Sequence, residues 1–190
     1  FLLAVVTFFL STPFVTYAQT FTDITSKTYE RNEIAKAIQD GWISPLTPTT
    51  FGYGVNIQPD QWLYMLMFLR TSDACPEYGL TPNAYWTPET IRACLAGAGV
   101  PVATASPLVI RRDEAMQQLF ALRRRSFAFQ NLQTKPVGYS APSDLATIAA
   151  SKQGAMIAAD RLKLLFRSKN NILPAAPLLR EDAVLAVSRF

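Results

Sequence analysis

The chain of 190 residues is long enough for one domain with a hydrophobic core, or for a few small modules that share one. It contains no histidine, which excludes the commonest general base, the usual zinc ligand and every nucleophile that depends on a histidine. The formal net charge of +4 favours anionic partners.

Residues 1–18 carry no charge, and their apolar run of about ten residues is typical of the hydrophobic region of a signal peptide. We expect cleavage after Ala18, because Thr16 supplies the small residue that precedes such a site. The protein is therefore expected to be exported to the cell surface, cell wall or periplasm. It would meet a membrane only through this segment, if the segment is not cleaved. The alternative for residues 1–18 is an ordinary buried strand or helix.

The pattern of residues 28–39 predicts a short helix, in which Ile34 and Ile38 fall at helical spacing. Asp40 and Gly41 follow as a C-terminal stop, because glycine adopts the left-handed conformation of a helix cap without strain.

Residues 42–56 contain two prolines and two glycines and are expected to form a loop. Residues 57–70 then resume a helical pattern. Pro59 stands near its start, where a missing N–H does no harm, and Asp60 suits the helix dipole. The first unit is therefore predicted to be helix, loop, helix.

The same order recurs after a connector. Thr87 begins a helix that runs through residues 90–99, and residues 109–125 form the second helix of this unit. The basic run at residues 123–125 lacks interleaved aromatic residues, which favours a solvated helix end over a nucleic-acid site.

The third copy is weaker. Residues 152–169 are predicted to be helical, and Asn170 and Asn171 replace the stopping glycine. Residues 178–190 form the last predicted helix.

The sequence therefore predicts an all-α fold of three helix-loop-helix repeats at residues 19–72, 73–130 and 131–190, each too small to bury its apolar face alone. The pattern allows short strand-like pieces near residues 52–57 and 107–110.

The two cysteines are Cys75 and Cys94. A disulfide between them is permitted in an exported protein and would stabilise it by roughly 3 kcal/mol. The alternative is two free, buried thiols, because sequence does not show whether their Cα atoms approach closely enough. Two cysteines do not make a metal site, and we expect no bound metal.

The first unit resembles an S-layer homology repeat. Its sequence "FTDI", its helix ending "AIQDGWIS" and its loop "TFGYGVNI" match the order of the family's motifs. The sequences "VIRRDEA" and "LLREDAV" resemble the family's helix starts in the second and third units. This resemblance covers nearly all of the chain after residue 18. It implies a pseudo-threefold helical bundle whose grooves between repeats bind an anionic cell-wall glycan.

The family's helix start, Thr-Arg-Ala-Glu, is a capping box that leaves its arginine free to face a groove and hold an anion. In this chain the corresponding tetrads begin at residues 58, 111 and 179. They keep the arginine as Arg112 and Arg180 and the acid as Glu114, whereas the first has Pro59 in place of arginine. The resemblance therefore implies glycan binding by these three charged residues. The alternative for each arginine is pairing with a nearby carboxylate on a solvated helix end.

The resemblance adds Asp23 and Gly41 to the candidate glycan-binding residues. Asp23 is alternatively a turn or helix-capping residue, and Gly41 serves the helix stop. Trp86 is the best candidate for an exposed ring that stacks on sugar, whereas Trp62 is expected in the core.

We expect a non-catalytic module without cofactors that attaches an exported protein to the cell envelope through anionic cell-wall polymer or peptidoglycan. The alternative is a degenerate bundle that docks another envelope protein. An enzyme is disfavoured, because the sequence shows no nucleophile–base pair, metal cluster or phosphate loop. Two facing carboxylates, as a glycosidase needs, are not excluded.

Overall fold

A computed structural model describes residues 21–69, 86–103, 107–122 and 127–190, with side chains from residue 130 in the last of these segments. These residues form helices, loops and isolated β-bridges but no β-strand. The prediction of an all-α fold is confirmed. The predicted signal segment and the basic run at residues 123–125 lie outside the described residues.

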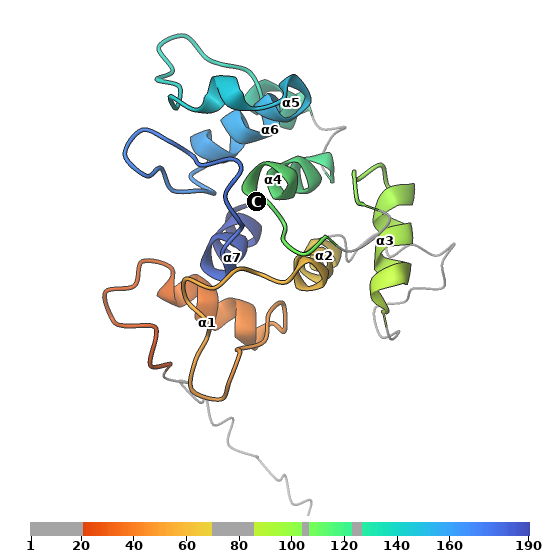
Figure 1. Cartoon of the computed structure of the whole chain (residues 1–190), viewed down its shortest axis with the longest axis vertical. Coiled ribbons are helices and arrows are strands. Elements are labelled where there is room, and N and C mark those ends of the chain that lie inside the picture. Colours follow the sequence, from red (N-terminus) through yellow and green to blue (C-terminus); the bar gives the residue numbers. More distant parts are fainter. Residues whose placement is uncertain (1–20, 70–85, 104–106, 123–126) are drawn as a thin grey trace, which may run out of the picture.

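In chain order, six helices of the described residues make three helix-loop-helix units, and two short helices lie between the second unit and the third (Figure 1). The bounds are α1 (Arg31–Gln39), α2 (Pro59–Phe68), α3 (Pro88–Gly97), α4 (Arg112–Ala121), α5 (Phe127–Leu132), η3 (Leu145–Thr147), α6 (Ala150–Arg161) and α7 (Arg180–Arg189). We call α1 with α2 unit 1, α3 with α4 unit 2, and α6 with α7 unit 3.

The units pack in cyclic order. The first helix of each unit lies against the second helix of the unit before it: α3 against α2, α6 against α4, and α1 against α7 (Figure 1). We call these contacts the first, second and third junctions. Because α1 packs against α7, the first and last parts of the described chain are joined directly.

Backbone hydrogen bonds join the segments that precede the second helices. The Ile57 N–H donates to the Leu178 carbonyl, and the Leu178 N–H donates to the Ile110 carbonyl, each at 2.9 Å. Of the strand-like pieces that the sequence allowed, residues 52–57 contain one isolated bridge, between Asn56 and Leu179, and residues 107–110 contain none. A further bridge joins Arg111 to Pro177. Unit 3 therefore contacts both other units at the centre.

The first helix of every unit ends with a left-handed residue. Gly41, Gly99 and Lys163 have φ of 77°, 80° and 57°. In each unit the following amide donates to the carbonyl five residues earlier, as in a Schellman motif. The predicted stop at Gly41 is confirmed. The predicted third-unit helix over residues 152–169 is wrong, because α6 ends at Arg161 and Lys163, not an asparagine, is the left-handed residue after it.

The core lies between the second helices. Trp62 on α2 is fully buried, as predicted, and every residue of α7 from Arg180 to Val187 is buried. Thr87 caps α3 by accepting a hydrogen bond from the Thr90 N–H, which confirms the predicted helix start. Among the described residues, none of the helices has the length and apolarity needed to cross a membrane.

The left-handed Lys163 generates a stability prediction. A side chain in this conformation costs about 1 kcal/mol, so Lys163→Gly is expected to raise the free energy of unfolding by about that amount. Gly41→Ala is expected to lower it by a similar amount, although a Cβ there meets no atom within 4 Å. Urea denaturation of both variants measures the two changes, and a destabilised Lys163→Gly protein would contradict this account.

Candidate functional site

Asp23 holds the loop of unit 1. Its carboxylate accepts hydrogen bonds from the backbone N–H groups of Phe51, Gly52 and Tyr53 at 2.9, 2.6 and 2.8 Å. Burial acts to raise the pKa of Asp23, but these three hydrogen bonds outweigh it and lower the pKa below its usual value. The carboxylate is therefore engaged within the protein, where the sequence had suggested a glycan contact or a turn residue.

Asp144 holds the corresponding loop of unit 3 by accepting backbone hydrogen bonds. This role of Asp144 was not predicted from the sequence. Its carboxylate accepts from the Ile172 and Leu173 N–H groups, 28 and 29 positions along the chain. Asp23 accepts from Phe51 and Gly52 at the same two separations. The sequence signal that could have revealed Asp144 is the similarity of residues 143–145, Ser-Asp-Leu, to residues 22–24, Thr-Asp-Ile. The proline before Ser143 made this similarity harder to see.

Arg180 closes the third junction. Its guanidinium donates to the Phe51 carbonyl at 3.0 Å, to Gln61 Oε1 at 2.6 Å and to the Ser44 carbonyl. It also lies over the Phe51 ring, with 4.9 Å between Cζ and the ring centroid. Its exposed fraction is 1%. Burial lowers the pKa of the guanidinium, although the nearby Glu181 and Asp23 charges oppose this effect.

Arg112 closes the second junction in the same way. Its guanidinium donates to the Ile172 carbonyl at 3.1 Å and to Asp182 Oδ2 at 2.6 Å. Its exposed fraction is 8%. Burial raises the pKa of Asp182, although the Arg112 charge and its hydrogen bond oppose the shift.

The two arginines were expected either to face a groove and hold an anion or to pair on a solvated helix end. Arg112 and Arg180 instead lie in the interior of the protein. Their guanidinium nitrogens donate hydrogen bonds to carbonyl, amide and carboxylate oxygens of the same chain. Buried arginine paired in this way is typical of a structural contact. The pairing is fuller at Arg180, because the buried Arg112 Nε has no hydrogen-bond partner among the described residues. A glycan carboxylate would have to displace these contacts to reach either guanidinium.

The first junction has no such arginine, because Pro59 occupies the first position of α2. A cavity of about 240 Å³ lies beside this proline. Its apolar lining includes Trp62 and Leu63 from α2 and Ile110 before α4. Its polar lining consists of Arg92, Glu114, Gln117, Gln118 and Lys152.

Two consecutive hydrogen bonds, which we call the polar relay, hold the apolar wall of the cavity in place. Trp62 Nε1 donates to Gln118 Oε1 at 2.8 Å, and Gln118 Nε2 donates to the Pro101 carbonyl at 3.1 Å. The relay ties α2, α4 and the loop of unit 2 together, so it holds the indole ring at the cavity.

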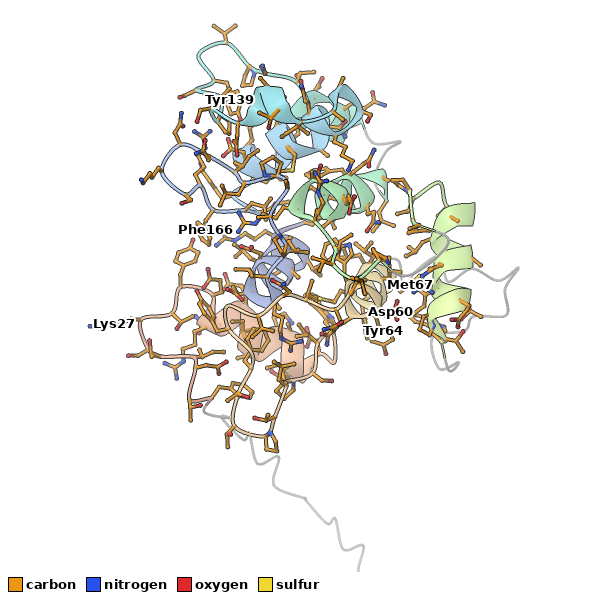
Figure 2. All side chains as sticks on the ribbon, in the orientation of Figure 1. Lys27, Asp60, Tyr64, Met67, Tyr139 and Phe166 are labelled. Carbon is orange, nitrogen blue, oxygen red and sulfur yellow. The ribbon has the colours of Figure 1, made fainter. Side chains whose placement is uncertain are left out.

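Both cations that line the cavity already face carboxylates. Lys152 Nζ lies 3.3 Å from Asp113 Oδ2 and 3.6 Å from Glu114 Oε1. Arg92 contacts Asp60, which Figure 2 shows between α2 and α3, and lies 3.9 Å from Glu89. The cavity therefore presents no excess of positive charge.

The remaining predicted residues lie elsewhere. Gly41 serves the cap of α1 and does not line the cavity. Trp86 is half-buried rather than exposed, and packs its ring edge-to-face on Tyr64 with 6.0 Å between centroids. Cys94 is buried and disulfide-bonded, which excludes a free thiol there. Cys75 lies outside the described residues, so its pairing with Cys94 stays a prediction. Of the predicted glycan-binding residues, Glu114 alone lines the cavity.

A second surface combines exposed aromatic and basic side chains. Tyr29 is 63% exposed and Phe166 is 42% exposed, and their rings pack edge-to-face with 5.3 Å between centroids. Arg189 fixes Tyr29 by donating to its hydroxyl at 2.8 Å. A second nitrogen of Arg189 donates to the Lys163 carbonyl at 2.8 Å, so this lysine lies beside the aromatic pair.

Three exposed lysines lie close in sequence to the pair: Lys27 stands two residues before Tyr29, and Lys163 and Lys169 stand three residues on either side of Phe166. None of the three side chains has a salt bridge among the described residues. Figure 2 shows Phe166 and Lys27 on the side of the molecule away from α3. We call Tyr29, Phe166 and these lysines the basic aromatic surface.

Within the described residues, no group of three or more cysteine, aspartate or glutamate side chains could hold a metal ion. No protein-family model matches the chain, and no curated protein matches it.

The burial of Arg180 generates a prediction. Arg180→Ala should lower the free energy of unfolding by about 3 kcal/mol or more, because it leaves the carbonyl of the buried Phe51 without its donor and removes the hydrogen bonds to Ser44 and Gln61. Arg31→Ala is the control, because Arg31 is exposed and lies on α1. Denaturant titration compares the two, and equal small losses would show that Arg180 does not hold the third junction.

The stability of the protein is expected to depend on pH through Glu181. Its carboxylate accepts from the Gly54 N–H, and burial raises its pKa above the usual value of 4.5. Glu181 therefore contributes stability below pH 4.5 that is lost as the pH rises through its folded pKa. Glu181→Gln should thus be more stable than the parent at pH 7 and equal to it near pH 4. Exposed Glu89→Gln is the control, and melting temperatures that differ equally at both pH values would contradict this explanation.

Proposed function

We propose that the protein is a non-catalytic module that attaches an exported protein to the cell envelope by binding an anionic cell-wall polymer. The observation that supports this most directly is the basic aromatic surface. The cyclic packing of three helix pairs is compatible with the pseudo-threefold bundle that the S-layer homology resemblance implies.

The chemistry of the basic aromatic surface suits an acidic polysaccharide. One face of a sugar ring presents C–H groups that pack on an aromatic ring, and its acidic substituents attract lysine. Tyr29 is held in place by Arg189 and Phe166 before any ligand arrives. A side chain fixed in advance loses little conformational entropy on binding, which favours its use as a contact surface.

A second candidate function is docking of another envelope protein. The observation that favours it is the cavity at the first junction, which has an apolar wall and a polar rim and has Pro59 where the other two junctions have a helix-start arginine. The two functions use different surfaces, so each can be tested without the other.

Cosedimentation with purified cell wall tests the main proposal. Tyr29→Ala combined with Phe166→Ala should weaken binding by about ten-fold, because ring stacking contributes on the order of 1 kcal/mol per contact. Replacing Lys27, Lys163 and Lys169 with Gln should also weaken binding and reduce its dependence on salt. Tyr64→Ala is the matched control, because Tyr64 is an exposed ring at the first junction.

Two results would contradict the proposal. One is a parent protein that does not sediment with wall at low salt. The other is binding that is unchanged in both surface variants while circular dichroism shows that they are folded.

A further inference from the structure

The two closed junctions share one contact pattern. An arginine at the first position of a second helix reaches into the next unit, where it donates to a loop carbonyl and to the side chain at the third position of that unit's second helix. Arg180 reaches Phe51 and Gln61, and Arg112 reaches Ile172 and Asp182. Gln61 and Asp182 are the third residues of α2 and α7.

The first junction keeps the acceptor but not the donor. The third residue of α4 is Glu114, and the first residue of α2 is Pro59. Both line the cavity of about 240 Å³. The cavity therefore lies where the pattern of the other junctions places a guanidinium, with a carboxylate in the position of its acceptor.

We propose that this cavity binds an arginine side chain of a partner polypeptide, which supplies in trans the guanidinium that the chain supplies itself at the other two junctions. This binding activity is separate from the proposed attachment to wall polymer, and neither depends on the other.

The contacts of Glu114 leave its carboxylate accessible to such a group. Its side chain is 36% exposed, and its closest charged neighbour, Lys152, is 3.6 Å away. Lys152 lies closer to Asp113, at 3.3 Å. Glu114 also accepts from the Arg111 N–H, at the long distance of 3.5 Å. A guanidinium would add charge-assisted hydrogen bonds to the Glu114 carboxylate.

The apolar wall suits the rest of an arginine. Trp62, Leu63 and Ile110 offer surface for the methylene stem, which arginine packs against apolar groups while its head makes polar contacts. Gln117 adds a polar group at the rim, and its side chain makes no hydrogen bond among the described residues. An anion is disfavoured, because the two cations at the cavity already face the carboxylates of Asp60, Glu89, Asp113 and Glu114.

Calorimetric titration of the full chain with three small probes tests the proposal. The probes are N-acetyl-arginine amide, its uncharged analogue N-acetyl-citrulline amide, and N-acetyl-lysine amide. The arginine probe should bind about ten-fold more tightly than citrulline, since a hydrogen bond to a charged group has that effect or more. Glu114→Gln should remove this difference, whereas Glu89→Gln should keep it.

Pro59→Arg supplies the missing side chain in cis. It should abolish binding of the arginine probe, while Pro59→Ala should retain it. Wall cosedimentation of Pro59→Arg should equal that of the parent, which separates this site from the basic aromatic surface. If Pro59→Arg fails to fold, the Glu114→Gln titration still decides the question.

Three results would overturn the proposal. Equal affinity for arginine and citrulline would show that charge is not recognised. Unchanged binding by Pro59→Arg would place the site elsewhere. Tighter binding of the lysine probe would assign the cavity to an ammonium group, such as the free amine of a wall peptide, instead of an arginine.

Discussion

The insertion of the Arg180 guanidinium into unit 1 is the contact on which the closed arrangement depends. Arg180 stands at the start of the last helix, and its acceptor Phe51 is 129 positions earlier in the chain. The same loop is held from the other side by Asp23. One buried cation thus fixes a loop, a helix start and the contact between the first and last units. Because each of these parts satisfies polar groups of another, loss of any one exposes unpaired groups in the rest.

The features that the sequence predicted well are local ones. The stop at Gly41 and the start at Thr87 depend on backbone conformation within a few residues, so the residue type alone indicates them. The end of α6 escaped prediction, because a lysine adopts the left-handed conformation only where the surrounding structure compensates for it. At Lys163 the surroundings include a hydrogen bond from Arg189 to its carbonyl.

The candidate sites were predicted less well, because their contacts depend on parts of the chain that are distant in sequence. The tetrads identified Arg112 and Arg180 correctly as corresponding positions, but their burial depends on acceptors contributed by another unit. No local pattern shows whether a helix-start arginine faces solvent or a distant carbonyl. The sequence likewise did not single out Tyr29 and Phe166, since they become a pair only when the segment before α1 and the loop after α6 meet.

Pro59 shows how one residue can serve the local structure and open the assembly. At the first position of α2, proline favours helix initiation because its φ is already suited to a helix and its missing N–H is not needed. It brings no cation to the first junction, however, and a cavity remains there. Neighbouring side chains tend to relax into an empty cavity. Here the hydrogen bonds from Trp62 to Gln118 and from Gln118 to Pro101 hold the apolar wall in place. The described structure therefore has two junctions at which a helix-start arginine reaches the next unit, and one at which proline stands in that position beside a cavity.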